Sequence, residues 1–231
     1  MPRPALLVLV VLAAAIPAFA LASPVSTPVP VREPFDRVAL RGDFQVEVRE
    51  GGPASVEIVA EPGWAERIQV EVVKGELRLS RKADFDSAGG VLVKVGSPSF
   101  RGLAVSGSGK GTAESGPVPR DVELSLSGSG KIAWAGTAAA LDLGISGSGK
   151  ARLTGKGESL KVAVSGSGKV DAKEFPVKDA AVAVAGSGDV DVRLSGGTLT
   201  AQIAGSGDVN WWGEGQVGAV STAGSGKVRK R

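Results

Sequence analysis

The chain has 231 residues, a formal net charge of +3 and 42% hydrophobic residues, enough apolar material for a folded domain. It contains no cysteine, histidine or tyrosine, so disulfide bonds, thiol lipidation and histidine-based catalysis are excluded. Its 27 lysines and arginines nearly balance 24 acidic residues, and aromatic residues make up only 4%. This composition argues against a nucleic-acid binder, which normally presents a basic face with stacking aromatics.

Residues 1–22 have the features of a secretory signal peptide. A positive charge at Arg3 precedes a short apolar run over residues 5–16, and Ala20-Leu21-Ala22 fits a small-x-small cleavage site before Ser23. The alternative is a membrane anchor, but the apolar run is short and a proline follows it. We therefore expect an exported bacterial protein, periplasmic or at the cell surface, with no transmembrane segment after signal removal.

The next part of the chain predicts a linker and then irregular strands. Residues 23–34 are proline-rich and predict a short extended linker. Residues 35–100 alternate apolar and polar residues without a repeat, and the candidate strands are 44–48, 55–59, 68–72, 77–79 and 91–95. A short helix or turn is expected over 61–67, where Trp64 would cover an open core. We expect irregular first coils and a cap of one domain spanning 35–231; a separate small β domain is the alternative.

A Gly-Ser-Gly motif recurs seven times in residues 101–231, at successive spacings of 21, 19, 19, 20, 19 and 19 residues. The copies begin at Gly107, Gly128, Gly147, Gly166, Gly186, Gly205 and Gly224. A fixed period near twenty is typical of a solenoid, in which each repeat forms one turn of a stacked coil. The regular part of the domain is therefore expected over 101–231.

The residues that flank each motif predict two strands per coil. Apolar residues stand two and four positions before the first glycine, and mostly again four and six positions after it, with small or polar residues between. This period-two alternation buries one strand face. We predict an all-β parallel β-helix of about 20 residues per coil, built as strand, tight corner, strand and variable loop. Trp134 and Trp211 are expected inside, and Trp212 outside.

The outward positions after the corners place acidic residues of neighbouring coils together. The candidate ligand-binding residues are Asp171, Asp189, Asp191, Asp208, Asn210 and Trp212. One interpretation is a sugar or Ca²⁺ site, because Ca²⁺ takes several oxygen ligands and an exposed tryptophan stacks on sugar rings. The simpler interpretation is a set of solvated carboxylates in ion pairs with Lys169 and Lys227. We expect no catalytic residue, no cofactor and no metal.

Two further interpretations follow from the same coils. Parallel β-helices host polysaccharide hydrolases and lyases, and Asp189 with Asp208, or Asp171 with Asp191, could provide paired carboxylates, although an exposed ladder lacks the burial that raises the pKa of a general acid. A second face is flat and built from small residues. These residues, suited to a partner or to self-association, are Ala104, Ser125, Ala163 and Ala183.

The serial motifs resemble those of the bacterial GIN-domain family, also called the putative auto-transporter adhesin head domain. The matching segments are LSGSGKI (126–132), ISGSGKA (145–151), VSGSGKV (164–170), VAGSGDV (184–190) and IAGSGDV (203–209). The resemblance implies an exported right-handed β-helix with an adhesin-like role. We therefore expect a non-enzymatic binding module of the cell envelope, with polysaccharide or a surface protein as partner. A polysaccharide-active enzyme and a passive envelope scaffold are the alternatives.

Overall fold

A computed structural model describes residues 23–83, 85–86 and 88–231, so the expected signal peptide lies outside the described residues. The N-terminal elements are β1 (Val25–Val29), β2 (Arg37–Gly42), β3 (Gln45–Glu50), β4 (Ser55–Ala60), the 3₁₀ turn η1 (Ala65–Arg67), β5 (Ile68–Val73), β6 (Glu76–Arg81) and β7 (Leu92–Ser97). The later elements are β8 (Gly102–Gly107), β9 (Lys110–Glu114), β10 (Arg120–Gly128), β11 (Lys131–Gly147), β12 (Lys150–Gly166), β13 (Lys169–Gly186), β14 (Asp189–Gly205), β15 (Val209–Gly224) and β16 (Val228–Lys230).

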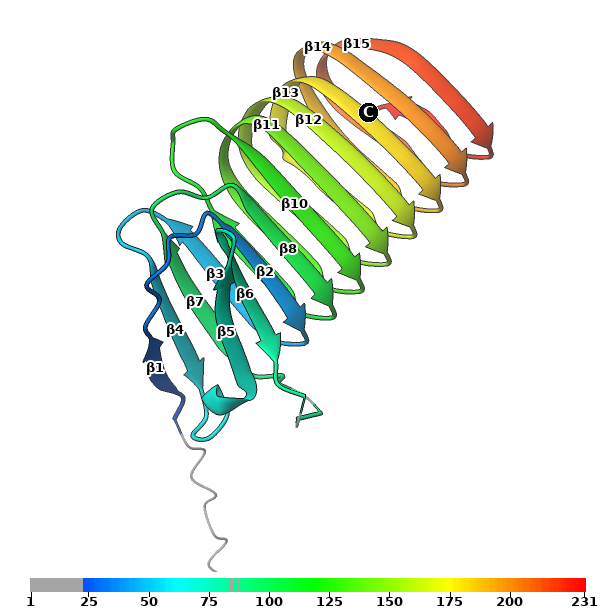
Figure 1. Cartoon of the computed structure of the whole chain (residues 1–231). Helices are drawn as coiled ribbons and strands as arrows, with labels where there is room; N and C mark the ends of the chain where they lie inside the picture. Colours follow the sequence, from blue (N-terminus) through cyan, green and yellow to red (C-terminus); the bar gives the residue numbers. More distant parts are fainter. Residues whose placement is uncertain (1–22, 84, 87) are drawn as a thin grey trace, which may run out of the picture.

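The strands from β10 to β15 stack as successive coils in one column (Figure 1). Each strand pairs in parallel with the next, and equivalent residues lie in register, as Leu124 does with Leu143 and Leu143 with Val162. Every coil thereby satisfies its backbone groups with two neighbours. The predicted parallel β-solenoid is confirmed, and so are the candidate strands of the N-terminal part.

The corners explain why the repeat is Gly-Ser-Gly. The first glycine has a positive φ, +117° at Gly147, and a Cβ there would meet the Gly128 carbonyl oxygen at 2.6 Å. The third glycine faces the core, and a Cβ on Gly149 would meet Leu126 Cδ2 at 2.5 Å. The central serine is exposed, and its backbone N–H donates to the preceding coil, as Ser148 does to the Gly128 carbonyl. Close stacking therefore excludes a side chain at both glycines.

The variable loop that the sequence predicted between coils is absent from β11 onward in the described part of the chain. Each of these coils is a single strand of 16 to 18 residues that bends without a break. Gly136 and Gly155 have positive φ at the bend, where a Cβ on Gly155 would meet the Gly136 carbonyl oxygen. Inside the bend, the Trp134 and Phe175 rings pack edge to face at 5.4 Å. From β8 to β16, a loop other than the corners remains only before β10.

The N-terminal strands extend the same sheet, but not in chain order. β2 and β3 lie between β6 and β7 on one side and β8 and β9 on the other, all in parallel. Gly42 stands in register with Gly107, so this coil has the corner Gly42-Asp43-Phe44 instead of Gly-Ser-Gly. At the end of the column, β4 and β5 run antiparallel to β7 and β6. The first part of the chain thus closes one end of the column with antiparallel strands.

The proline-rich segment expected to be a linker contains an edge strand. Val25–Val29 forms β1, which pairs antiparallel with β4. Pro28 is tolerated there because an edge strand has one side on which no N–H is needed. Trp64 packs against the core beside η1, as expected, and the Arg67 guanidinium lies 3.8 Å from its ring centroid.

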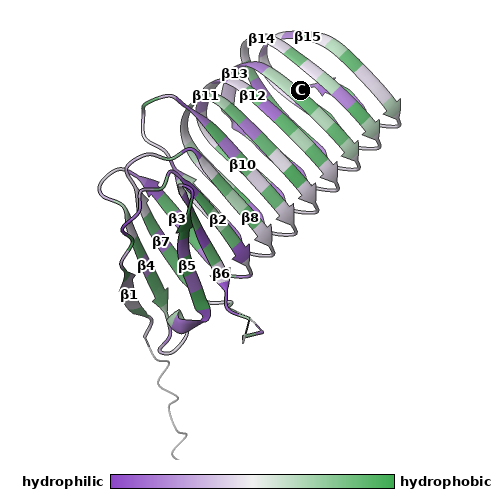
Figure 2. Ribbon diagram, in the orientation of Figure 1, coloured by the Kyte–Doolittle hydropathy of each residue, from purple (hydrophilic) through white to green (hydrophobic). Residues whose placement is uncertain are grey.

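A continuous apolar core runs through the column (Figure 2). Trp134 and Trp211 are 1% and 5% exposed, which confirms their predicted inward orientation. The last coil differs, because Val217 and Val220 lie over the core positions Leu199 and Ala201 but remain 42% and 44% exposed. The described strand β16 pairs only with residues 209–211 and does not cover them. Among the described residues, no helix is long and apolar enough to cross a membrane.

Candidate functional site

Each corner divides a coil into two outer faces. We call the outward residues that precede a Gly-Ser-Gly motif the pre-corner face, and those that follow it the post-corner face. Alternation along the strand sends every second side chain outward, and parallel pairing in register aligns these side chains into rows that cross the coils. Each coil therefore contributes one residue to a row, and neighbouring residues of a row lie about 4.8 Å apart.

The post-corner face carries two charged rows. The first row follows the corner directly and consists of Lys110, Lys131, Lys150, Lys169, Asp189, Asp208 and Lys227. The second row stands two residues further and consists of Thr112, Ala133, Arg152, Asp171, Asp191, Asn210 and Arg229. The first row is basic as far as Lys169 and acidic at Asp189 and Asp208, and the second row is acidic at Asp171 and Asp191. The structure therefore brings together five of the six candidate residues in these rows.

The carboxylates of this cluster all have cationic neighbours. Lys169 Nζ lies 2.9 Å from Asp189 Oδ2, and Arg229 Nη1 lies 2.5 Å from Asp208 Oδ2. Lys173 Nζ lies 3.5 Å from Asp191 Oδ2 and 3.7 Å from Asp171 Oδ1.

Amide groups complete the cluster. Asn210 Nδ2 donates a hydrogen bond to Asp191 Oδ1 at 3.0 Å. Lys227 supplies its backbone N–H to Asp208 Oδ1, also at 3.0 Å. The ion pair expected between Lys169 and an aspartate is therefore present, whereas the basic side chain beside Asp208 is that of Arg229.

Two groups of the cluster have shifted pKa values. The hydrogen bond from Arg229 is the main cause that lowers the pKa of the Asp208 carboxyl, and the backbone N–H of Lys227 acts in the same direction. The hydrogen bond to Asp189, together with its charge, raises the pKa of the Lys169 ammonium. Both shifts favour the charged forms. A glycosidase general acid needs a raised carboxyl pKa, so Asp208 is suited to an ion pair rather than to proton donation.

Trp212 lies on the same side of the coil as this cluster. It follows the buried Trp211 and is half-buried, which confirms that it faces outward. The Lys173 ammonium stands 5.7 Å from the centroid of its ring. Lys173 thus contacts two carboxylates and an aromatic ring, a role that sequence reasoning missed. Its position two residues after Asp171 was the available signal, although a β-bulge there shifts the register.

A shallow groove runs along the post-corner face. It has a volume of about 560 Å³ and extends from Lys110 to Asn210 across the coils. The short side chain of Ala133 lies at the bottom of the groove, and the longer charged side chains form its sides. Across the described ranges 23–83, 85–86 and 88–231, no three acidic side chains are grouped to hold a metal ion. The groove offers paired charges and an open floor.

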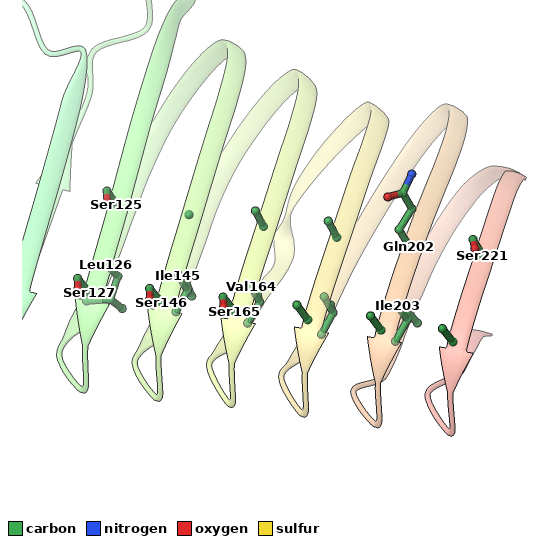
Figure 3. Close-up of a pocket in the computed structure, with 17 residues that line it drawn as sticks. Ser125, Leu126, Ser127, Ile145, Ser146, Val164, Ser165, Gln202, Ile203 and Ser221 are labelled. Atoms are coloured by element: carbon green, nitrogen blue, oxygen red, sulfur yellow. The ribbon is translucent and has the colours of Figure 1, made fainter.

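The pre-corner face is flatter and less charged (Figure 3). Serine and alanine side chains predominate along it from β10 to β15, and Gln202 stands above them. They line a shallow depression of about 750 Å³ that includes Ser125, Ala163 and Ala183. Nearer the bend, the face carries the exposed ion pair between Asp142 and Lys161, at 3.2 Å. The structure thus places the small residues predicted from the sequence on one accessible surface.

Comparisons with known proteins agree with this architecture. A family model described as "Putative auto-transporter adhesin, head GIN domain" matches residues 34–215. A comparison with curated proteins finds no match.

Three solved structures share the fold. A putative adhesin from Bacteroides fragilis has a TM-score of 0.83 and 18% identity, covering 90% of this chain and 97% of that one. A putative lipid binding protein from Parabacteroides distasonis has a TM-score of 0.70 and 19% identity, with coverages of 90% and 97%. A putative adhesin from Parabacteroides merdae has a TM-score of 0.67 and 17% identity, with coverages of 90% and 96%. At these identities, the likeness concerns the fold.

Proposed function

Because the chain belongs to the family described as putative auto-transporter adhesin, head GIN domain, we propose that it is an exported, non-enzymatic binding module of the bacterial cell envelope. The observation that carries the proposal is the open, charged groove of the post-corner face. Open sheet surfaces with regularly spaced polar groups suit extended ligands, since no walls limit their length. An exported location, in the periplasm or at the cell surface, would give such a module access to envelope polymers.

The cluster of Asp171, Asp189, Asp191, Asp208 and Asn210 beside Trp212 would bind saccharide. Its side chains present carboxylate and amide oxygens next to ammonium and guanidinium groups, so hydroxyl groups of a sugar find both donors and acceptors. Trp212 offers an aromatic surface at the border of the cluster. These groups are already paired with one another and need little reorganisation on binding, which lowers the entropic cost.

The polar groups favour binding over catalysis. A hydrolase needs one carboxyl that stays protonated near neutral pH, usually through burial. Asp208 has a lowered pKa, and its side chain is 32% exposed beside Arg229. The repeats hold to 19 to 21 residues, so the coils supply no long loops to wall a cleft.

The proposal is tested by binding of the purified protein to a panel of bacterial and host polysaccharides, with and without Ca²⁺, followed by analysis of glycan length. We expect retention of intact glycan that weakens by about tenfold in an Asp189→Ala, Asp191→Ala variant and in Trp212→Ala. Asp142→Ala, which breaks an exposed ion pair on the pre-corner face, is the matched control and should bind normally. Shortened glycan would favour an enzyme, and no retention at all would favour the passive scaffold.

A further inference from the structure

A run of lysines on the post-corner face forms no ion pair with any acidic residue that the structure describes. Lys110, Lys131 and Lys150 occupy the same position in three successive coils, with Lys131 in register with both of the others. All three side chains are exposed. We propose that this lysine row binds a linear acidic polysaccharide, which would make it the ligand class of the module. The proposal rests on the proposed function and adds a site outside the acidic cluster.

The lysine row is distinguished by three like charges that follow one another in register. Some cations on the coils have a carboxylate close by, as Lys169 has Asp189, Lys161 has Asp142 and Arg229 has Asp208. Among the ion pairs of the described residues, none involves Lys110, Lys131 or Lys150. In the same row position, the next coils carry both signs, because Asp189 stands beside Lys169.

Like charges directly opposite one another on neighbouring strands repel and destabilise a sheet. Within the lysine row, the repulsion recurs twice, because Lys131 lies between Lys110 and Lys150 at a strand spacing of about 4.8 Å, and Lys150 also stands in register with Lys169. Arg152 adds a further positive charge in the second row, one coil after Ala133. An anionic ligand would neutralise all four groups together, so the repulsion in the free protein becomes attraction in the complex.

The shape and the lining of the groove around the lysine row indicate which class of anion it would bind. The lysines line the basic half of the groove of about 560 Å³, whose low floor passes Ala133 and continues toward Asp191. This shape accommodates an extended chain that runs across the coils, with an anionic group near each lysine. No aromatic side chain lines the groove among the described residues, so bases of a nucleic acid would have no stacking platform there. A sugar polymer with carboxylate or sulfate groups fits both features.

The test measures binding of the purified protein to dextran sulfate and to polygalacturonate, with neutral dextran as the uncharged probe. Lys131→Glu places a carboxylate between two lysines, and we expect about a tenfold loss of affinity for the anionic probe that binds. Lys156→Glu makes the same charge change in the bend of the coil that contains Lys150, away from the groove, and should stay within about twofold of the unchanged protein. The affinity should also fall as the salt concentration rises.

A stability readout separates binding from folding. Since Lys131→Glu replaces two repulsive pairs by two attractive ones, its melting temperature should equal or exceed that of the unchanged protein. Weaker binding by a variant that is equally or more stable would support the lysine row.

Several results would overturn the proposal. They are equal binding of Lys131→Glu and the unchanged protein, equally tight binding of single-stranded DNA, or retention of neutral glycans alone. In the last case, the module would still bind glycan, so the proposed function would stand while the lysine row would not be its site. Absence of binding to every glycan, charged or neutral, would contradict both.

Discussion

The column from β8 onward and the strands before it belong to one sheet, but they differ in how the order of strands in the chain relates to their order in the sheet. In the column, the order along the chain equals the order in space, and every corner is Gly-Ser-Gly. Before it, β2 and β3 lie between strands that follow them in the chain, and their corner ends in the fully buried Phe44. The first arrangement permits indefinite stacking, whereas the second closes the stack with antiparallel β4 and β5.

The corner glycines allow one coil to stack closely on the next. Gly107 stacks on Gly42, and a Cβ on Gly107 would meet the Gly42 carbonyl oxygen at 2.7 Å. At the third corner position, Phe44 is fully buried, and its ring lies beside Gly42, where a Cβ would meet Phe44 Cε1 at 3.1 Å. Identical corners are thus required where coils repeat, and a large side chain is possible where the repeat stops.

The largest expected effect is at the junction between the two regions. Phe44→Ala removes a fully buried ring and leaves a cavity at the irregular corner, so we expect a loss of about 3–5 kcal/mol in the free energy of unfolding. Chemical denaturation monitored by circular dichroism measures it. Val118→Ala, at a side chain that is 57% exposed, is the control and should change stability little. A loss below about 1 kcal/mol for Phe44→Ala would mean that the ring is not a structural core residue.

Within the column, two glycines of one coil give a matched pair. Gly147→Ala combines a positive φ of +117° with a close contact to the rigid Gly128 backbone, and it should cost about 3 kcal/mol. Gly144→Ala, three residues earlier, meets nothing within 4 Å and should be neutral or slightly stabilising. Thermal denaturation of both variants measures the difference. Equal melting temperatures would refute the stacking explanation of the corner.

The N-terminal region supplies the intermediate case. Gly63 also has a positive φ, of +81°, but a Cβ there meets nothing within 4 Å. Gly63→Ala should therefore cost only the backbone strain, about 1 kcal/mol, because no neighbouring coil is stacked on this turn. The same denaturation series tests it. A loss as large as that of Gly147→Ala would show that φ, and not stacking, decides the cost in both regions.

The smallest expected effect concerns pH. The folded pKa of Asp208 lies below its unfolded value, so its ion pair with Arg229 stabilises the fold above the unfolded pKa near 3.8 and is lost as the pH falls through the folded value. Asp208→Asn should lower the melting temperature slightly at pH 7 and not near pH 2. Glu214→Gln, at an exposed position in β15, is the control and should follow the unchanged protein. A deficit of Asp208→Asn that persists in acid would contradict this assignment.

Much of the column could be predicted from the sequence, because its period and alternation repeat seven times. The inward positions of Trp134 and Trp211 followed from counting two residues at a time. The continuous bend could not be predicted, since it depends on how Gly136 and Gly155 stack on one another across coils. The position of β2 between β6 and β8 was also hidden, because no motif in residues 35–100 records which strands pair.

The sequence predicted which residues of the candidate site lie in the same rows, but it did not predict their ion pairs. Asp171, Asp189 and Asp191 were expected to lie together, and the register brings them together. Which cation each carboxylate pairs with depends on side-chain reach and on the bulge near Lys173, neither of which the repeat encodes. The lysine row could be identified in the sequence, but only the stacked coils show that none of the described carboxylates pairs with it.

The position of β2 has a consequence for the order in which the chain folds. Val38 pairs with Leu77 on one side and with Leu103 on the other, so neither neighbour exists until much later residues have emerged. Closing these long loops is entropically costly and slow. Each later coil, by contrast, pairs with residues about 19 positions earlier in the chain, which have already formed a strand. A chain that is synthesised from its N-terminus must therefore wait to assemble its first strands, after which each new coil adds to the one before it.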